Sequence, residues 1–348
     1  MTGSIAIAAD YNPSPNEFAS AIVMRPDGKV LYGFKSDIPH TAASLSKLVM
    51  ALVVLDKNWN WGTAVRMSSA DEVGGGRLRV AAGARVILAD LWQSAIGSSA
   101  NNATTAIARL AGPGVTTFVG RMNAKAKAIG ATSSKFFDPS GMNPKNTTTA
   151  HDMALIARDA FQQPKVVSAS QSGTYTFTLA GSTNKHTIKN TNAPLLADPD
   201  LYLVGGKTGY LPESMYNYAA KLSPLVMDGK ARDPKKDVVV VVLGANSTQG
   251  AMNSAKHLAE WAWSDEEHFK KVSLHPKPTR SLFNGLSGND VRWVQEKLNV
   301  EPVNGNFGPA TRAAVQMFQV AQGIAKPGNS GYGVVGPMTR ARLIGLAP

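Results

Sequence analysis

Residues 45–55 of this chain form an almost unbroken apolar run that contains one lysine, Lys47. A run this apolar on every side is typical of a helix that is buried in the centre of a protein. Ser44 then lies in the first turn of the helix, and Lys47, three residues later, lies on the same face. We therefore predict a core helix that holds a hydroxyl and an amine next to each other.

A lysine on a buried helix is unfavourable unless it is neutralised or paired, because the charge loses its hydration. Lowering its pKa from about 10.4 to between 7 and 8 takes roughly three units, or about 4 kcal/mol. Burial and a second nearby cation can supply this, and Lys207 is the candidate for that cation. A neutral Lys47 can accept the proton of Ser44, as a serine nucleophile requires. The alternative is a lysine that reaches solvent beside a serine that caps the helix.

A second polar string, Ser99-Ala100-Asn101, interrupts a helical pattern. The apolar periodicity runs up to Ile96 and resumes at Ala103, with Gly-Ser-Ser between them as a break. We expect the side chains of Ser99 and Asn101 to point into a cleft. The alternative is that they only cap the following helix.

The third string, Lys207-Thr208-Gly209, follows an apolar segment at 201–204 and reads as the end of a strand. Glycines flank Lys207 on both sides, and glycine lets a ligand approach the backbone closely. The alternative is a strand-end turn with a solvated lysine, which does not explain the accompanying Thr208 and Gly209.

The length of 348 residues suits two or three compact units. Runs at 19–24 and 29–34 flank a Pro-Asp-Gly turn and predict a hairpin. Strands at about 202–208, 216–221 and 237–243 are expected to join it in one antiparallel sheet. A helix at about 252–263 covers one face, and the mostly helical segment 88–160 forms the other wall of a cleft. The fold class is α/β.

Together the three strings resemble the motif set of the low-molecular-weight penicillin-binding proteins, the serine D-alanyl-D-alanine carboxypeptidases of the peptidase S11 type. The resemblance covers roughly residues 17–265 and includes the strings at 122–130, 137–142, 147–154 and 240–245. It implies the penicillin-binding or β-lactamase-like transpeptidase fold, in which an antiparallel sheet flanked by helices is joined to a helical subdomain.

The resemblance also implies a role for each motif residue. Ser44 would attack the penultimate D-alanyl carbonyl of a peptidoglycan stem peptide, and Lys47 would accept its proton. Ser99 would help to pass that proton to the leaving amine, while Asn101 bonds the substrate amide and Lys47. Lys207 and Thr208 would bind the substrate carboxylate, and Gly209 would let the substrate approach the backbone closely. The backbone N–H groups of Ser44 and Tyr210 would form an oxyanion hole. A β-lactam would acylate Ser44.

Two departures from the family pattern leave the reaction open. After Lys-Thr-Gly the family usually has a Thr, an acidic residue and an Ala-Gly pair, whereas residues 211–216 read Leu-Pro-Glu-Ser-Met-Tyr. The arginine that many carboxypeptidases use to hold the substrate carboxylate corresponds to about Ala251. The alternatives to a carboxypeptidase are a D,D-endopeptidase that cleaves D-Ala cross-links and a penicillin-reactive wall binder with little turnover. A class A β-lactamase is disfavoured because residues 73–212 contain no glutamate.

The C-terminal segment has a different pattern, with three short amphipathic helices expected near 291–298, from Pro309 and from Pro337. The strings at 304–311 and 334–339 read as one turn-plus-helix unit used twice. Residues 281–346 resemble the type 1 peptidoglycan-binding domain, a small all-α module of three helices; the alternative is a generic bundle without a ligand. We predict a catalytic domain at 1–270, a linker containing Pro276 and Pro278 at 271–280, and a peptidoglycan-binding domain at 281–348.

The net charge is +12, with basic residues throughout the chain and no aromatic-laced basic run, which disfavours a nucleic-acid partner. Attraction to anionic wall polymers is the better account. The predicted partners are peptidoglycan, as substrate and anchor, and β-lactams as covalent inhibitors.

Zero cysteines exclude disulfides and thiolate catalysis. The six histidines form no metal-binding pair, so we predict neither a metal nor a cofactor, the alternative being a metal-dependent wall peptidase. No stretch is long and apolar enough to span a bilayer, and the first residues lack the charged region of a signal peptide. We expect action in the periplasm or cell wall, with the signal peptide absent from this sequence.

Overall fold

The computed structural model describes residues 17–226, 231–269 and 275–345. They form two compact units with a boundary between His268 and Phe269. The predicted linker at 271–280 begins outside the described residues. Within the described residues, no helix has the length and apolar character needed to cross a membrane.

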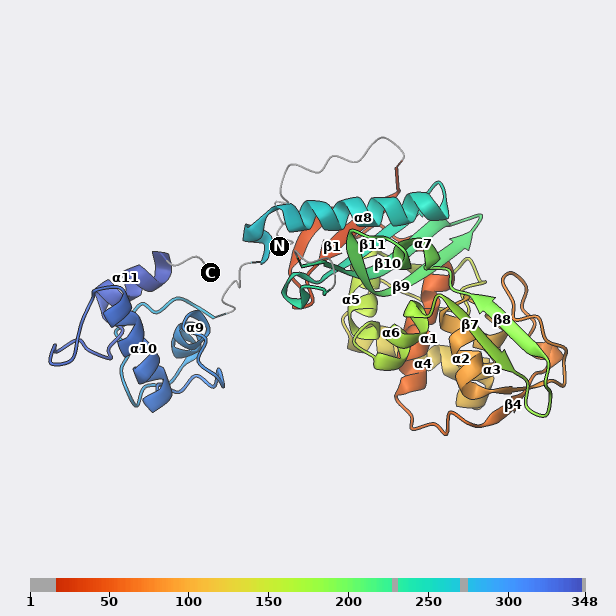
Figure 1. The fold of residues 1–348 in the computed structure, drawn as a ribbon, viewed down its shortest axis with the longest axis horizontal. Coiled ribbons are helices and arrows are strands. Elements are labelled where there is room, and N and C mark those ends of the chain that lie inside the picture. The colour runs from red at the N-terminus through yellow and green to blue at the C-terminus, as the bar shows by residue number, and fades with distance from the viewer. Residues whose placement is uncertain (1–16, 227–230, 270–274, 346–348) are drawn as a thin grey trace. The chain divides into compact units, whose positions relative to one another are not determined.

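The first unit is built on a five-stranded antiparallel sheet, in the order β2-β1-β11-β10-β9. This confirms the predicted sheet, and Figure 1 shows its strands side by side. The strands are β1 (Ser20–Met24), β2 (Val30–Phe34), β9 (Leu201–Leu211), β10 (Met215–Pro224) and β11 (Val238–Ala245).

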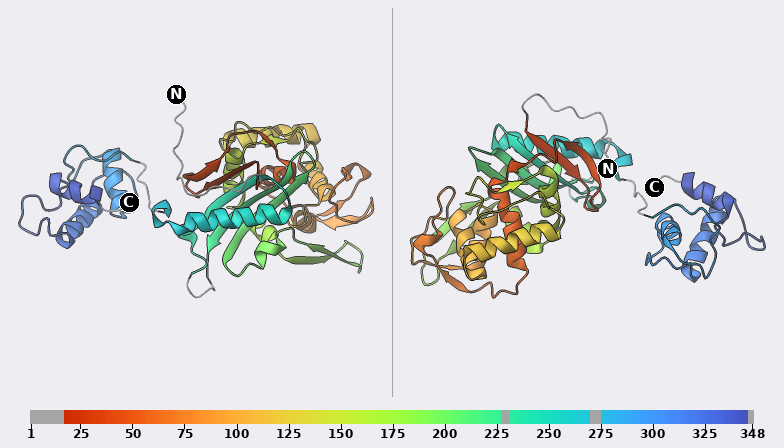
Figure 2. Two further views of the ribbon diagram at one scale, coloured as in Figure 1. Left: turned by 90° about the horizontal axis from the view of Figure 1, so that it is seen from above. Right: turned by 180° about the vertical axis from the view of Figure 1, so that it is seen from behind.

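Helices cover both faces of this sheet. Helix α8 (Thr248–Ser264) packs on β10 and β11 from one side, and α5 (Ala150–Ala160) packs on β1, β10 and β11 from the other. The views in Figure 2 show α8 lying across the strands. Because both faces of β11 are covered, its five consecutive valines are fully buried and show no alternation between polar and apolar residues.

The predicted helical segment contains α2 (Leu88–Ile96), α3 (Asn101–Ala111), α4 (Val115–Ala128) and α5. Helix α1 (Ser46–Leu55) packs against α3, α4 and α5, so the apolar run forms the central helix that its composition predicts. The short helices α6 (Pro164–Gln171) and α7 (Ala193–Leu196) pack against β9.

Three small two-stranded sheets were not expected from the sequence pattern. They pair β3 (His40–Thr41) with β6 (Thr147–Thr148), β4 (Ala64–Arg66) with β5 (Arg85–Ile87), and β7 (Thr174–Thr178) with β8 (Lys185–Lys189). Each is short, and none contains the apolar run that marks a core strand, so their tertiary neighbours determine the pairing.

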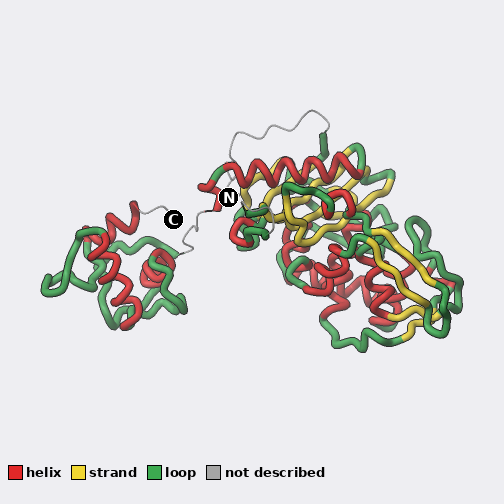
Figure 3. The backbone as a smooth tube through the Cα atoms, viewed as in Figure 1, coloured by secondary structure: helices red, strands yellow, loops and turns green. Residues whose placement is uncertain are grey.

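The second unit consists of helices and loops around a small core (Figure 3). Its helices are α9 (Asn289–Lys297), α10 (Pro309–Ala321) and α11 (Pro337–Gly345), as the sequence predicts.

The predicted repeat is visible in the hydrogen bonds of two buried glutamines. The Nε2 atom of Gln295 donates to Thr311 Oγ1 at 3.1 Å, and its Oε1 accepts from the Gly305 amide at 2.8 Å. Gln319 makes the same two kinds of bond, to Thr339 Oγ1 at 2.9 Å and from the amide of Gly333 at 2.7 Å. Each glutamine therefore fastens one loop to the start of the following helix.

Candidate active site

Ser44 lies in a 3-10 turn, η1 (Ala43–Leu45), that leads directly into α1 at Ser46. The expectation that Ser44 belongs to the first turn of the α-helix is therefore corrected. The physical reason is the backbone of Ala43, whose φ of 47° is left-handed and cannot continue a right-handed helix. Ser44 remains partly exposed, whereas Lys47 is fully buried.

The Nζ atom of Lys47 contacts three oxygen atoms. It lies 2.9 Å from Ser44 Oγ, 2.7 Å from Asn101 Oδ1 and 2.5 Å from the backbone carbonyl oxygen of Ser140. Burial lowers the pKa of Lys47 to about 7, and the negative charge of Asp138 opposes that shift. A lysine that reaches solvent, the alternative for this motif, is excluded by the complete burial of its side chain.

Ser99 lies in the predicted break between α2 and α3, and Asn101 is the first residue of α3, which begins two residues before the predicted position. The N-cap of α3 is Ala100, which makes no side-chain capping bond. Asn101 instead directs its Oδ1 to Lys47, and its Nδ2 donates to the carbonyl oxygen of Gly74 at 2.8 Å. The helix-capping alternative for Ser99 and Asn101 is therefore wrong.

Lys207 lies in the middle of β9, paired with Ala219 of β10, and is fully buried. The strand expected at about 202–208 contains Lys207, and β9 extends past it to Leu211, because β10 pairs with it along this length. The Nζ atom of Lys207 donates to Ser99 Oγ at 2.7 Å and to the carbonyl oxygen of Thr208 at 2.8 Å.

The electrostatic relation between the two lysines differs from the expected one. We expected burial and the charge of Lys207 together to lower the pKa of Lys47. Burial is the main cause of the shift, and the charge that acts on Lys47 is that of Asp138, which raises the pKa. The pKa of Lys207 is itself lowered well below its usual value, first by burial and then by the positive charge of Lys47.

The motif residues line one cavity of about 440 Å³. Its wall includes Ser44, Ser99, Asn101, Thr208, Gly209 and Tyr210. Tyr210 is 51% exposed and stacks on Tyr216, with 4.5 Å between the ring centroids. The Thr208 hydroxyl bonds to that of Thr191 at 2.9 Å, and Thr191 also lines the cavity.

The backbone of β9 passes close to the nucleophile. A methyl group added at Gly209 would lie 3.3 Å from the Ser44 nitrogen, tighter than most real contacts. Glycine therefore lets β9 approach η1, and this approach places the strand beside the Ser44 amide. The predicted oxyanion hole needs this proximity, because its two amides come from η1 and β9.

The loop at 138–143 was not assigned to the active site from the sequence. The Asp138 carboxylate accepts bonds from the amides of Ser140, Gly141 and Asn143 at 2.7 to 2.8 Å, and from the Ser140 hydroxyl at 2.6 Å. These bonds fix the loop so that the Ser140 carbonyl meets Lys47. The Asp-Pro-Ser-Gly string was a signal for a tight turn, but nothing in it showed that the turn touches Lys47.

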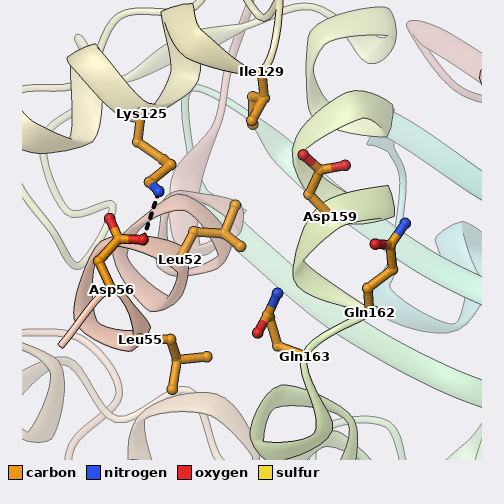
Figure 4. A pocket seen from close by; sticks show the side chains of 8 residues that line it. All are labelled: Leu52, Leu55, Asp56, Lys125, Ile129, Asp159, Gln162 and Gln163. Carbon is orange, nitrogen blue, oxygen red and sulfur yellow. Dashed lines mark hydrogen bonds and ion pairs between the residues drawn. The ribbon is translucent and has the colours of Figure 1, made fainter. Parts of the chain in front are cut away.

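A separate pocket of about 240 Å³ lies at the opposite end of α1 (Figure 4). It is lined by Leu52 and Leu55 and by the ion pair between Lys125 and Asp56, at 2.7 Å. None of the predicted site residues lines it. Among the residues that the structure describes, no group of three or more His, Asp, Glu or Cys is placed to hold a metal ion.

Comparison with known proteins agrees with this geometry. The family model described as D-alanyl-D-alanine carboxypeptidase matches residues 11–247, and the one described as a putative peptidoglycan binding domain matches residues 287–343. The D-alanyl-D-alanine endopeptidase of Haemophilus influenzae is 30% identical over 230 residues, 65% of this chain and 74% of that protein. The endopeptidase of Pseudomonas aeruginosa is 32% identical over 173 residues, which span 46% of this chain and only 56% of that protein.

Solved structures show the same fold. A D-alanyl-D-alanine carboxypeptidase from Mycobacterium tuberculosis matches with a TM-score of 0.64 and 26% identity, over 75% of this chain and 97% of that one. A point mutant of the Streptomyces K15 DD-transpeptidase matches with a TM-score of 0.65 over 73% of this chain and 100% of that one; at 23% identity this likeness concerns the fold alone. Because the first family model covers more than half of the sequence, the chain belongs to the D-alanyl-D-alanine carboxypeptidase family, peptidase S11.

Proposed function

We propose that this protein is a serine D,D-peptidase that hydrolyses D-alanyl bonds in peptidoglycan stem peptides through an acyl-enzyme on Ser44. The observation that carries the proposal is the fully buried Lys47 amine, 2.9 Å from Ser44 Oγ, with a pKa near neutrality. An amine in this state can be neutral at physiological pH and accept the serine proton.

In the acylation step, Ser44 Oγ bonds to the D-alanyl carbonyl carbon as its proton passes to Lys47. The amides of Ser44 and Tyr210 stabilise the resulting oxyanion. When the carbon–nitrogen bond breaks, the proton returns by way of Ser99 to the leaving amine. In deacylation, a water molecule adds to the ester, its proton passes to Lys47, and Ser44 leaves with a proton as the carboxylate product forms.

The substrate carboxylate, or the group that replaces it in a cross-link, is assigned to the β9 side of the cavity. Thr208 and Thr191 offer hydroxyl donors there, with Thr248 at the start of α8. Lys207 holds Ser99 through the hydrogen bond that its Nζ atom donates to Ser99 Oγ.

A D,D-endopeptidase is the second candidate. It is favoured because the position where many carboxypeptidases carry a carboxylate-binding arginine has no such residue in this chain. That position corresponds to Ala251, which is buried in α8 and carries no cation. Three of the curated relatives are named D-alanyl-D-alanine endopeptidases, and others are named D-alanyl-D-alanine carboxypeptidases. Without the arginine, a free terminal carboxylate loses a bidentate partner, which matters less for an internal cross-link.

The second unit is proposed to hold the enzyme on its polymeric substrate, since residues 287–343 match a peptidoglycan-binding family. This places the activity outside the cytoplasm, where peptidoglycan is found. β-Lactams, which mimic the D-Ala-D-Ala terminus, are the expected covalent inhibitors.

The test is a parallel digestion of purified linear and cross-linked muropeptides by the full chain. Free D-alanine from the linear substrate identifies a carboxypeptidase, whereas monomers released from the cross-linked substrate identify an endopeptidase. Ser44→Ala should abolish either product, and a chelator should leave it unchanged. If neither product forms although penicillin still labels Ser44, the protein is a penicillin-reactive wall binder and the peptidase proposal fails.

A further inference from the structure

The positive charge of this chain is concentrated in one part of the sequence. Residues 73–197 contain thirteen Lys and Arg, four Asp and no Glu, so they contribute +9 of the total net charge of +12. This segment forms the helical wall of the catalytic cavity and the β7–β8 hairpin. Basic residues also occur elsewhere in the chain, and the four at 302–348 are accompanied by no acids, but residues 73–197 hold the largest excess of positive charge.

The four aspartates of the segment do little to neutralise its surface. Asp90 and Asp152 are buried, Asp90 accepting a bond from the Tyr175 hydroxyl at 2.6 Å and Asp152 from the Ser133 amide at 2.8 Å. Asp138 is occupied by the amides of its own loop, and Asp159 pairs with the adjacent Arg158. Carboxylates outside the segment pair with three of its cations, Glu72 with Arg77, Asp71 with Arg109 and Asp56 with Lys125. The other exposed cations of this wall include the two lysines of β8.

The β7–β8 hairpin presents these cations in a regular pattern. Along β8, Lys185, Thr187 and Lys189 are exposed, and the intervening residues are partly buried. Their cross-strand partners on β7, which are Thr178, Thr176 and Thr174, are exposed as well. Thr176 and Thr187 bond through their hydroxyls at 2.9 Å. One face of the hairpin therefore consists of three threonines of β7 beside two lysines and a threonine of β8. We call it the hairpin face.

The opposite side of the hairpin anchors it to the wall. Phe177 is buried and stacks on His186, with 5.6 Å between the ring centroids. The Ala180 amide donates to the carbonyl oxygen of Arg85 at 2.9 Å, which ties the turn of the hairpin to β5. Figure 1 shows β7 and β8 extending from the region of α7 toward β4. In the part of the chain that the structure describes, no carboxylate pairs with Lys185 or Lys189.

The hairpin face leads directly into the catalytic cavity. Strand β8 ends at Lys189, and two residues later Thr191 lines the cavity and bonds to Thr208. The Thr191 amide donates to the carbonyl oxygen of Gly97 at 2.9 Å, next to the Ser99 motif. A substrate strand that leaves the cavity past Thr191 therefore meets Lys189 first and Lys185 further out.

We propose that the hairpin face binds carboxylate groups of the stem peptides of polymeric peptidoglycan, outside the cavity where the bond is cleaved. This inference rests on the proposed function, since it concerns the substrate of the same site. Alternate residues of a strand are about 7 Å apart, so the two lysines are separated by about 13 Å. An extended peptide has nearly the same repeat and can present carboxylates at this spacing. The threonine hydroxyls are donors and acceptors for its amides.

The hairpin face is tested by ligand binding to the full chain carrying Ser44→Ala, so that binding is measured without cleavage of the probe. The probes are a cross-linked muropeptide dimer with free carboxylates and the same dimer with its carboxylates amidated. The test variant adds Lys185→Glu and Lys189→Glu. The matched control adds Lys127→Glu and Lys235→Glu, two exposed lysines on α4 and in the η3 turn (Pro234–Lys236), and changes the net charge by the same amount.

We expect the test variant to bind the free-carboxylate dimer about tenfold more weakly at low salt, with a smaller difference at high salt. The amidated dimer should bind both variants equally, and the control should stay within twofold of the Ser44→Ala parent. With Ser44 intact, the test variant should be acylated by penicillin within twofold of the wild-type rate, because the cavity is unchanged.

An unaltered affinity for the free-carboxylate dimer would overturn the proposal, as would an equal loss for both dimers or a parallel loss of penicillin acylation. If a DNA duplex bound only when Lys185 and Lys189 were present, and the muropeptide dimer bound equally well without them, the hairpin face would be a nucleic-acid site instead. A carboxylate-specific loss in the test variant, found together with absence of any muropeptide cleavage by the wild type, would support the hairpin face and refute the peptidase. Muropeptide cleavage by the wild type without a carboxylate-specific loss of binding in the test variant would refute the proposed role of the hairpin face and leave the peptidase proposal standing.

Discussion

At the scale of single residues, the site depends on the protonation state of the Lys47 amine. Lys47 is fully buried and its Nζ atom contacts three oxygens, one of them the nucleophile. Burial favours the neutral amine, and Asp138 partly restores the charged form, so that the pKa is about 7. The burial of Lys47 was predictable from its apolar neighbours in sequence. The part played by Asp138 was not, because 91 residues separate it from Lys47 in the chain.

The rate of acylation by penicillin should rise with pH through an apparent pKa of about 7, because protonated Lys47 cannot accept the Ser44 proton. The measurement is the second-order acylation rate from pH 5.5 to pH 8.5. Lys47→Arg, which keeps the charge and cannot lose its proton, should be inactive throughout. A flat profile for the wild type would show that Lys47 is not the base.

Stability should depend on the same proton. The pKa of Lys47 is about 7 in the folded protein and about 10.5 in the unfolded chain, so between these values the unfolded state binds more protons. The free energy of unfolding should therefore rise from about pH 7 to about pH 10, with Lys207 contributing in the same direction. Denaturant titrations at several pH values measure this. Lys47→Met should reduce the rise and Lys235→Met, at an exposed position, should not.

Asp138→Asn should slow acylation about 10- to 100-fold and move the midpoint of its pH profile below that of the wild type. The rate falls because an amide cannot accept all the loop bonds that the carboxylate accepts. The midpoint falls because the charge that raises the pKa of Lys47 is removed. Asp152→Asn, at another buried aspartate that binds backbone amides, is the control and should not move the midpoint. A midpoint that stays in place or rises would contradict this role for Asp138.

At the scale of elements, the site is made where η1, β9 and the 138–143 loop meet. The loop approaches η1 so closely that a methyl group at Gly141 would lie 1.9 Å from the Ala43 carbonyl oxygen. The backbone at Gly141 also has a positive φ of 86°. Glycine is therefore required for two separate reasons, and the second is shared with glycines elsewhere in the chain.

Gly141→Ala should lower the penicillin acylation rate by at least tenfold, since the loop or η1 must move to admit the methyl group. The matched control is Gly181→Ala, where φ is 81° and a methyl group would meet no atom within 4 Å. It carries the same backbone strain of about 1 to 3 kcal/mol without the collision. Acylation rates and thermal unfolding of both variants are compared. Similar acylation in the two would show that the close approach does not position Ser44.

The sequence was informative about elements whose own residues determine them. The central helix and the strands of the main sheet follow from apolar runs that must be buried, and each was predicted close to its position. The 3-10 turn at Ser44 and the continuation of β9 beyond residue 208 to Leu211 were not predicted. Both depend on neighbours that are distant in sequence, namely the Asp138 loop and β10.

At the scale of the whole molecule, the chain combines a catalytic unit with a second unit that matches a peptidoglycan-binding family. The motif spacing predicted the first, and a repeated turn-plus-helix pattern predicted the second. The excess of basic residues at 73–197 can be counted in the sequence. The fold is needed to show that the acids of this segment are buried or paired.

The most direct test of the account is the intact mass of the full chain after incubation with benzylpenicillin, followed by mapping of the labelled peptide. One equivalent of penicillin should be attached at Ser44. Ser44→Ala and Lys47→Ala, each confirmed to be folded by circular dichroism, should carry none. A folded wild-type protein without an adduct, or with its adduct on another residue, would contradict the assignment of Ser44 and Lys47 as nucleophile and base.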